Sequence, residues 1–344
     1  MEALEKTPSS QPSRQRVVVC CFSEQEIERF WDGAQQASVA GSGMNWVLPP
    51  GSAGDWLSVL KSLRPEVILG AWQLPRIPDE FLEEYREFRY LCYFCGSVRE
   101  RISRRFLERG GIVTNWGELA ASTVAECALM LILASLRRVT RYALEMHVDR
   151  VWDRSEPMPA SLFGKSVGIH GFGAVARRLH SLLSPFGCRV EYWSEGVPDT
   201  VYAERGAQTA DSLEALFADN DVVVEAEALN SQTRHSVTAS TLNLLKSGSV
   251  FVNVGRGNVL APHAIEILAA RGDVLIGLDV YDSEPLRADS PLRGSRHVTL
   301  LPHTAGPTAD QYAAIRKQAL GFLERYLSGQ SVPNLCLETY DRMT

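Results

Sequence analysis

Three residues in the last third of the chain, Arg256, Glu284 and His303, supply a cation, a carboxylate and an imidazole. Each follows a short apolar run that predicts a buried strand, and these runs span residues 249–254, 274–278 and 297–301. In an open parallel sheet, the carboxyl ends of neighbouring strands line one crevice, and ligands bind there. The sequence therefore predicts that the three side chains converge on a site that holds an anion and moves a proton.

A glycine-rich turn lies between a predicted strand at 166–170 and a predicted helix. It reads Gly171-Phe-Gly-Ala-Val-Ala176, which is a Gly-x-Gly-x-x-Ala pattern. The first glycine permits a tight turn, the second lets a pyrophosphate approach the backbone, and the helix N-terminus supplies N–H donors. The pattern predicts dinucleotide binding by a set of neighbouring residues: Gly171, Phe172, Gly173, Ala174, Val175 and Arg177.

The predicted strand at 188–193 ends at Ser194 and Glu195. An acidic residue at this place usually accepts hydrogen bonds from the ribose hydroxyls of NAD. No Arg or Lys follows before Arg205, so a dedicated clamp for a 2′-phosphate is not evident. The sequence favours NAD as the cofactor, with NADP not excluded.

Strand-like runs alternate with helix-like stretches along the whole chain, with further strands expected at 16–22, 66–71, 90–95, 111–114 and 221–225. This alternation predicts the α/β class, with two doubly wound parallel-sheet domains. A long helical stretch over about 120–150 is expected to cross between the domains. A breaker cluster at 305–308 precedes a final amphipathic helix that ends near residue 327 and is expected to complete the first domain.

Length and composition set limits on function. The chain has 344 residues, 45% hydrophobic and 22% charged, and a formal net charge of −6 with no block of Lys and Arg. We therefore expect two domains and neither nucleic-acid nor membrane binding. The polar N-terminus, 1–15, lacks the apolar middle of a signal peptide and predicts a disordered tail. Seven cysteines and no sign of secretion favour reduced thiols in a cytoplasm, and Cys92 and Cys95 are expected to be buried and inert.

Four motifs in order, at 164–173, 253–257, 277–285 and 302–306, make the chain similar to the NAD-dependent D-isomer-specific 2-hydroxyacid dehydrogenases. The resemblance is dense from about 124 to 308. It implies a Rossmann NAD-binding domain over 119–304 and a discontinuous flavodoxin-like substrate domain made of 16–118 and 305–344. It also implies an active site between the two domains and a homodimer through the cofactor domain.

The resemblance assigns a role to each residue of the trio. Arg256 would bind the carboxylate and the keto oxygen of a 2-oxo acid, His303 would be the general acid/base, and Glu284 would bond that histidine. Asp279 would hold the nicotinamide carboxamide, and the neighbouring contacts to the cofactor would come from Val254, Gly255 and Gly306. The chemistry agrees, because imidazole donates protons near neutral pH and a guanidinium pairs with carboxylate.

Two segments depart from the family pattern. The substrate loop, usually Gly-x-Gly-x-Asp, here runs Gly96-Ser97-Val98-Arg99, and its amides at Ser97 and Val98 are expected to cradle a carboxylate. Arg99 either binds a second anionic group of the substrate or faces solvent. Residues 225–229 lack the usual His-x-Pro, which affects the contacts to adenosine.

Two other functions fit parts of the pattern. One is an NAD(H)-sensing binding protein, such as a corepressor, that uses this fold with little turnover. The other is a relative that acts on formate, but such enzymes generally have Gln where this chain has Glu284. The intact trio favours an enzyme that interconverts a 2-oxo acid and a D-2-hydroxy acid.

Overall fold

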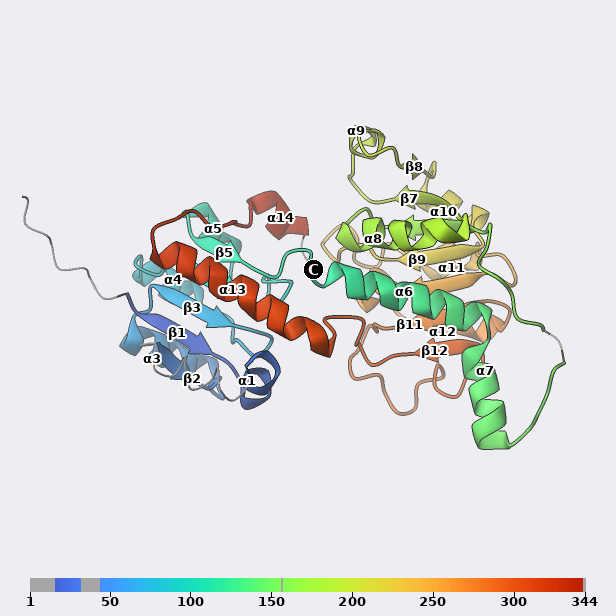
Figure 1. Ribbon diagram of the computed structural model, residues 1–344, viewed down its shortest axis with the longest axis horizontal. Coiled ribbons are helices and arrows are strands. Elements are labelled where there is room, and N and C mark those ends of the chain that lie inside the picture. Colours follow the sequence, from blue (N-terminus) through green and yellow to red (C-terminus); the bar gives the residue numbers. More distant parts are fainter. Residues whose placement is uncertain (1–15, 32–43, 156, 343–344) are drawn as a thin grey trace, which may run out of the picture. The chain divides into compact units, whose positions relative to one another are not determined.

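The computed structural model describes residues 16–31, 44–155 and 157–342, so the predicted tail at 1–15 lies outside the described part of the chain. The chain divides into two compact units (Figure 1). Unit 1 contains the described residues up to Cys95, together with 100–115 and 319–335. Unit 2 contains 96–99, 116–318 and the described residues from 336 onward.

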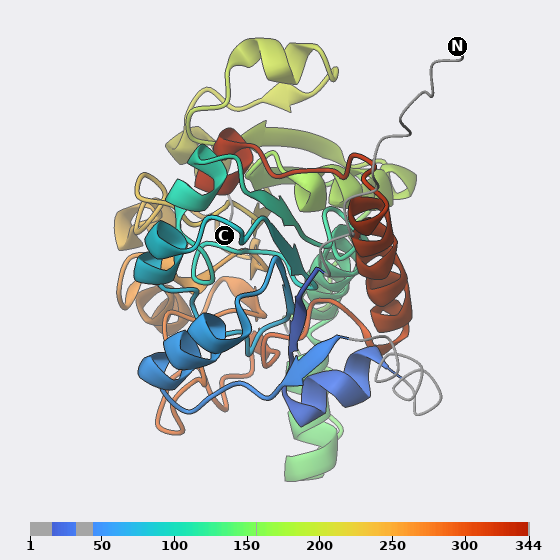
Figure 2. The same cartoon turned by 90° about the vertical axis from the view of Figure 1, so that its left-hand side faces the viewer.

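Unit 1 is built on five parallel strands in the order β2-β1-β3-β4-β5. Helix α1 and the end of α13 cover one face of this sheet, and α3, α4 and α5 cover the other (Figure 2). The apolar runs form the strands because both faces are covered, and every residue of β1, β3 and β4 is buried. The elements are β1 (Val18–Cys21), β2 (Asn45–Val47), β3 (Val67–Gly70), β4 (Tyr90–Tyr93), β5 (Ile112–Thr114), α1 (Glu24–Phe30), α3 (Ala53–Leu63), α4 (Asp79–Glu84), α5 (Arg104–Glu108) and α13 (Tyr312–Leu327).

The last part of unit 1 comes from the far end of the chain. The Tyr326 hydroxyl donates a hydrogen bond of 2.9 Å to Glu66 beside β3. The Asn334 side chain accepts the amide of Val113 in β5 at 2.8 Å. The unit boundary therefore falls inside α13, beyond the expected boundary at 304, and unit 1 is discontinuous in sequence.

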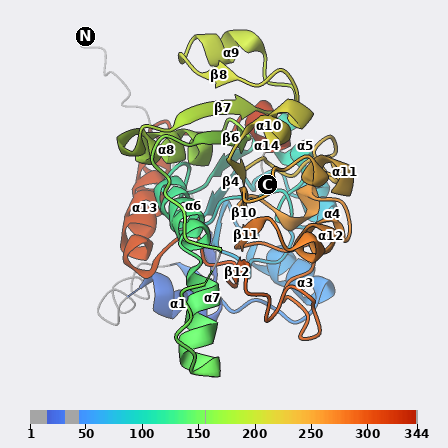
Figure 3. The same cartoon turned by 90° about the vertical axis from the view of Figure 1, so that its right-hand side faces the viewer.

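Unit 2 is built on seven parallel strands in the order β12-β11-β10-β9-β6-β7-β8. Helices α6 and α8 cover one face of this sheet, and α10, α11 and α12 cover the other (Figure 3). The strands are β6 (Ser166–His170), β7 (Arg189–Trp193), β8 (Gln208–Thr209), β9 (Val222–Glu225), β10 (Val250–Asn253), β11 (Leu275–Leu278) and β12 (Val298–Leu300). The helices are α6 (Ala121–Leu136), α7 (Val139–Ala143), α8 (Ala174–Leu183), α9 (Asp199–Ala203), α10 (Leu213–Asp219), α11 (Ala239–Asn243), α12 (Ala264–Arg271) and α14 (Leu337–Arg342), with short 3₁₀ turns at Ser184–Phe186, Gly257–Val259 and Ala309–Gln311.

The two parallel sheets confirm the predicted fold class. Each predicted strand is present with its ends shifted by at most two residues, whereas β2 and β8 were not predicted. These two strands have only three and two residues, none of them fully buried, so they leave no apolar run in the sequence.

The helical stretch predicted over 120–150 is present, but it is divided into separate helices. The stretch forms α6, then α7, then a π-helical turn at Leu144–Asp149. Arg138 adopts a left-handed conformation with φ of 55°, which ends one helix and starts the next in a new direction. Neither Gly nor Pro lies at this break, so it could not be predicted from the usual helix-breaking residues.

All seven cysteines lie in the described part of the chain and are free thiols. Cys92 and Cys95 are buried, as predicted. Burial raises the pKa of the Cys92 thiol to about 11, so it stays protonated and unreactive near neutral pH. Among the described residues, no helix is both long and apolar enough to cross a bilayer, and no cluster of three metal-binding side chains occurs.

Candidate active site

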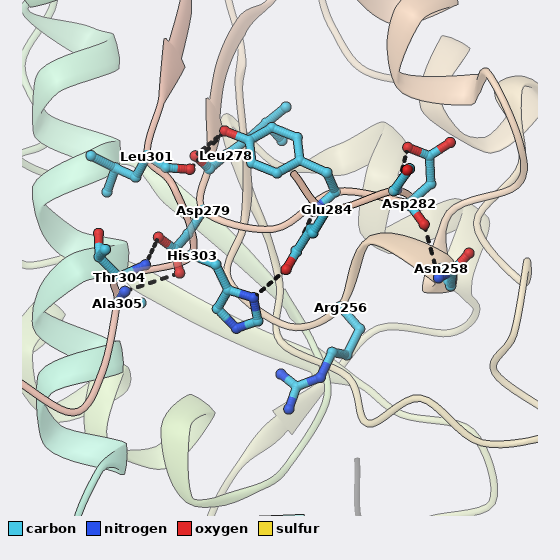
Figure 4. Close-up of polar contacts among 12 residues, drawn as sticks. Arg256, Asn258, Leu278, Asp279, Asp282, Glu284, Leu301, His303, Thr304 and Ala305 are labelled. Carbon is cyan, nitrogen blue, oxygen red and sulfur yellow. Dashed lines mark hydrogen bonds and ion pairs between the residues drawn. The ribbon is translucent and has the colours of Figure 1, made fainter. Parts of the chain in front are cut away.

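Arg256, Glu284 and His303 follow three strands that lie side by side at one edge of the unit 2 sheet. β10 pairs with β11, and β11 pairs with β12, all in parallel. Parallel pairing places the residues after the three strands at the same end of the sheet. The guanidinium of Arg256 and the second ring nitrogen of His303 lie on the same side of the site (Figure 4).

His303 and Glu284 form a direct pair, with 2.6 Å between Nδ1 and Oε2. The hydrogen bond to Glu284 is the main cause that raises the pKa of His303, and the Glu284 charge adds to it, against partial burial and the Arg256 charge. Burial works to raise the pKa of Glu284. The bonds from His303 and the Tyr281 amide, with the charges of His303 and Arg256, outweigh burial and lower it. The pair therefore favours an imidazolium beside a carboxylate.

Arg256 projects from a tight turn that Asn253 shapes. The Asn253 side chain accepts the Gly255 amide at 3.0 Å and reaches the Arg256 carbonyl at 3.4 Å. A Cβ on Gly257 would lie 1.9 Å from the carbonyl carbon of Tyr281, so only glycine lets the two turns touch. The turn after β10 thereby packs directly on the segment that carries Glu284.

Asp279 holds the segment that carries His303. Its two carboxylate oxygens accept the amides of Thr304 at 2.7 Å and Ala305 at 3.0 Å. His303 itself adopts a left-handed backbone with φ of 55°, which non-glycine residues rarely do. The buried Asp279 carboxylate therefore stabilises the strained turn that presents the imidazole. The role expected for Asp279 toward the nicotinamide carboxamide stays a prediction.

The glycine turn after β6 fits a dinucleotide phosphate. A Cβ on Gly171 would lie 2.7 Å from the Ala226 carbonyl oxygen, whereas one on Gly173 would meet nothing within 4 Å. The turn is therefore packed on its inner side and open at Gly173. Gly173 is the N-cap of α8 and provides no side-chain cap, so the first amides of this helix are available to an anion.

The other residues expected near the cofactor are held by packing or by hydrogen bonds. Phe172 packs on Tyr192 and Tyr202, with ring centroids 4.9 and 4.5 Å apart, so its main chain alone faces the turn. Arg177 donates to the Phe172 carbonyl at 3.0 Å and to Glu118 at 2.8 Å. The remaining residues are buried or half-buried around the strand ends: Ala174, Val175, Val254, Gly255 and Gly306.

Ser194 and Glu195 end β7 as predicted, and the structure adds a carboxylate that sequence reasoning missed. The Ser194 hydroxyl donates to Glu227, which follows β9. Behind it, His170 and Glu225 form a fully buried pair. The sequence contained a signal for this cluster, since two glutamates lie in the segment 225–229 that lacks the usual His-x-Pro, and a histidine precedes the glycine turn.

The loop Gly96–Arg99 belongs to unit 2 by its contacts. A Cβ on Gly96 would lie 2.9 Å from the indole nitrogen of Trp116, so this glycine permits a close approach. Val98 is fully buried, and Arg99 donates to the Leu229 carbonyl at 3.2 Å. The two segments that depart from the family pattern, 96–99 and 225–229, therefore touch.

Comparisons with known proteins point in one direction. A family model described as D-isomer specific 2-hydroxyacid dehydrogenase, NAD binding domain, matches residues 129–305. The chain is 30% identical over 233 residues to a glyoxylate reductase of Aeropyrum pernix, covering 66% of this chain and 69% of that protein. It is 32% identical over 232 residues to a glyoxylate/hydroxypyruvate reductase of Arabidopsis thaliana, covering 65% and 71%. A crystal structure of a glyoxylate reductase from Paecilomyes thermophila has the same fold, with a TM-score of 0.79 at 21% identity over 94% of this chain and 100% of that one.

Proposed function

Because the chain belongs to the D-isomer specific 2-hydroxyacid dehydrogenase family, we propose that it interconverts a 2-oxo acid and a D-2-hydroxy acid. Membership of the family makes it an oxidoreductase with a nicotinamide cofactor, which supplies the hydride. NAD(H) is the cofactor that we propose, and the named relatives make glyoxylate and hydroxypyruvate the first acids to test.

One observation carries the proposal: the imidazole of His303 bonds Glu284 through Nδ1, which leaves Nε2 to serve the substrate. In the direction of reduction, protonated Nε2 donates a proton to the carbonyl oxygen, and the imidazolium is favoured by the adjacent carboxylate. Arg256 binds the substrate carboxylate and polarises the carbonyl. The amides of Ser97 and Val98, in the loop that begins at Gly96, help to hold the carboxylate.

The cofactor half of the proposed site lies at the glycine turn between β6 and α8. Gly171, Gly173 and the first amides of α8 hold the pyrophosphate, with support from Arg177. Asp279 takes part through its position beside His303 and accepts the nicotinamide carboxamide on the remaining lone pairs of its oxygens.

The decisive experiment pairs turnover with cofactor binding. His303→Ala and Arg256→Ala should each lower kcat by about a hundredfold or more, while NADH affinity, measured by fluorescence titration, stays close to that of the unmodified chain. Unchanged turnover in both variants would contradict the assignment. NADH binding without turnover on a panel of 2-oxo acids would favour the sensing protein instead.

A homodimer and a reducing, cytoplasmic setting complete the proposal. Large apolar side chains are exposed along 146–163, including Trp152 at 79%, Phe163 at 70% and Val148 at 67%. Several exposed apolar side chains in one segment support a protein–protein contact, and a second copy of the chain is the partner proposed. Seven free thiols support the reducing compartment.

A further inference from the structure

Four polar side chains gather where the strand order of the unit 2 sheet reverses, between β6 and β9. His170 ends β6 and Glu225 ends β9, directly opposite it in register. The His170 Nδ1 lies 2.5 Å from the Glu225 Oε2, and both side chains are fully buried. The second Glu225 oxygen accepts the amide of Glu227 at 2.8 Å. Ligands of doubly wound sheets bind at this topological switch point.

Glu227 follows β9, and its carboxylate is bonded by the residue that directly follows β7. Ser194 stands at the end of β7, and its hydroxyl donates to the Glu227 Oε2. The Glu227 Oε1 accepts the adjacent amide of Ala228 at 2.8 Å, so its orientation is held on both sides. The residue is 8% exposed, so it is not fully sealed from solvent, and each of its carboxylate oxygens has a further lone pair that can accept a hydrogen bond.

The backbone around Glu227 is built against the phosphate turn. A Cβ on Gly171 would lie 2.9 Å from the Glu227 amide nitrogen, and one on Gly255 would lie 3.0 Å from its carbonyl oxygen. Both glycine turns therefore depend on a close approach to this residue. A dinucleotide whose pyrophosphate lies on the Gly171 turn must place its adjoining ribose next to the end of β7, which is beside Glu227.

The charge of the cluster supports the same role. Burial works against a charged His170, but the charge and hydrogen bond of Glu225, with the charges of Glu227 and Glu195, raise its pKa overall. Burial raises the pKa of Glu227, although the His170 charge and the bonds from Ser194 and Ala228 oppose that rise. The His170 charge and the bonds from Ser194 and Ala228 are thus the features that favour the charged form of Glu227.

The Nε2 atom of His170 adds an independent sign of a ligand site. It is buried and has no hydrogen-bond partner within the described part of the chain. Most buried polar atoms in folded proteins have a partner, and each exception calls for an explanation. No other buried histidine occurs among the described residues.

We propose that Glu227, held by Ser194, accepts the hydroxyls of the adenosine ribose and excludes a 2′-phosphate, and so makes the enzyme selective for NAD(H). This inference rests on the proposed dehydrogenase function. It differs from the sequence expectation, which gave the role to Ser194 and Glu195. A ribose diol donates to a carboxylate, whereas a phosphate dianion at the same position is repelled by it.

Fluorescence titration of the full chain with NADH and with NADPH tests the inference without any substrate acid. The unmodified protein should bind NADH more tightly than NADPH. Glu227→Gln keeps the shape of the side chain but removes its charge, and it should weaken NADH binding by about tenfold while it strengthens NADPH binding. Ser194→Ala removes the hydroxyl that bonds Glu227. This variant should also bind NADH with less preference over NADPH.

Two further variants make the test selective. Glu214→Gln is the matched control, because it makes the same change at an exposed glutamate at the start of α10. It should leave the ratio of NADH affinity to NADPH affinity unchanged. Glu195→Gln tests the exposed rival carboxylate and should change the ratio less than Glu227→Gln does. Thermal unfolding of each variant verifies that it is folded.

The inference would be overturned if Glu195→Gln changed the ratio of NADH affinity to NADPH affinity as much as Glu227→Gln or more. It would also be overturned if Glu227→Gln and Ser194→Ala left this ratio unchanged. Tighter binding of NADPH than NADH by the unmodified chain would overturn it too. If Glu227→Gln loses the preference for NADH while the unmodified chain reduces none of the 2-oxo acids, the ribose assignment is supported. The proposed reaction is then contradicted.

Discussion

Three carboxylates in unit 2 do different work because their surroundings differ. Glu284 is partly exposed and bonds an imidazole, and in the proposed reaction it tunes the proton donor. Asp279 is buried and accepts two main-chain amides, so it fixes the conformation of a turn. Glu227 accepts hydrogen bonds from the Ser194 hydroxyl and the Ala228 amide, one on each oxygen. The partners of each group, more than its residue type, therefore decide its role.

The Glu284–His303 pair makes a prediction about pH. The bond from Glu284 raises the pKa of His303, and reduction needs the protonated ring, so the reduction rate should persist above neutral pH and fall as the pH rises through that raised pKa. In Glu284→Gln the pKa should return toward the ordinary value of about 6.5. The fall in kcat/KM for reduction should then occur at lower pH, with a loss on the order of tenfold above neutrality.

The oxidation of a D-2-hydroxy acid provides the internal control for this pH prediction. That direction needs the neutral ring, so its rate should rise with pH through the same pKa and shift to lower pH in Glu284→Gln. Profiles of kcat/KM against pH, recorded for reduction and for oxidation, measure the fall and the rise. Identical profiles for the unmodified chain and the variant would show that Glu284 does not tune His303.

Asp279→Asn tests the turn that presents His303. An amide side chain offers one acceptor oxygen in place of two, so one of the Thr304 and Ala305 amides loses its partner inside the protein. We expect a loss of about 1–3 kcal/mol in the free energy of unfolding and a fall in kcat that exceeds the change in KM. The exposed Asp282→Asn is the control, and an equally large effect there would refute the role given to Asp279.

At the scale of elements, the turn after β10 and the segment after β11 touch through a glycine. A Cβ on Gly257 would lie 1.9 Å from the Tyr281 carbonyl carbon and 2.3 Å from the Asp282 amide nitrogen. Since both contacts are with backbone, no side-chain rotation can relieve them. The glycine in the Asn-x-x-Arg-Gly motif is therefore required by packing between two site-bearing turns, beside any role in binding.

Gly257→Ala should accordingly destabilise the protein by at least about 3 kcal/mol and abolish turnover, because it separates Arg256 from Glu284. Gly321→Ala in α13, where a Cβ would meet nothing within 4 Å, should be neutral or stabilising by about 0.5–1 kcal/mol. Chemical denaturation measures both changes. Equal stability of the two variants would refute the packing argument.

The elements also explain how far the sequence could predict the structure. Long apolar strands and the glycine turn were predictable because burial on both faces and a tight turn each leave a local pattern. β2, β8 and the break at Arg138 were not, since short exposed strands and a left-handed arginine leave none. The trio was predictable from its place after adjacent strands, whereas the Ser194–Glu227 bond joins two loops and depends on the sheet order.

At the scale of the whole molecule, the exposed apolar side chains Val148, Trp152 and Phe163 predict association of two copies. Trp152→Asp should place a charge in the contact and convert a dimer into a monomer, because burial of an unpaired charge is costly. Light scattering after size-exclusion chromatography measures the mass. Leu48→Asp, on an apolar side chain that is 57% exposed in unit 1, is the control and should leave the mass unchanged. A monomeric unmodified chain would contradict the proposed dimer.

The discontinuity of unit 1 has a consequence for the order in which the chain folds during synthesis. Every strand of both sheets precedes residue 301, yet Cys92 in β4, Glu66 beside β3 and Val113 in β5 contact partners beyond residue 318. Ribosomes deliver the chain from its N-terminus, so the sheet of unit 2 emerges complete before unit 1 receives its closing helix. The unit that is translated first should therefore be the last to reach its native state.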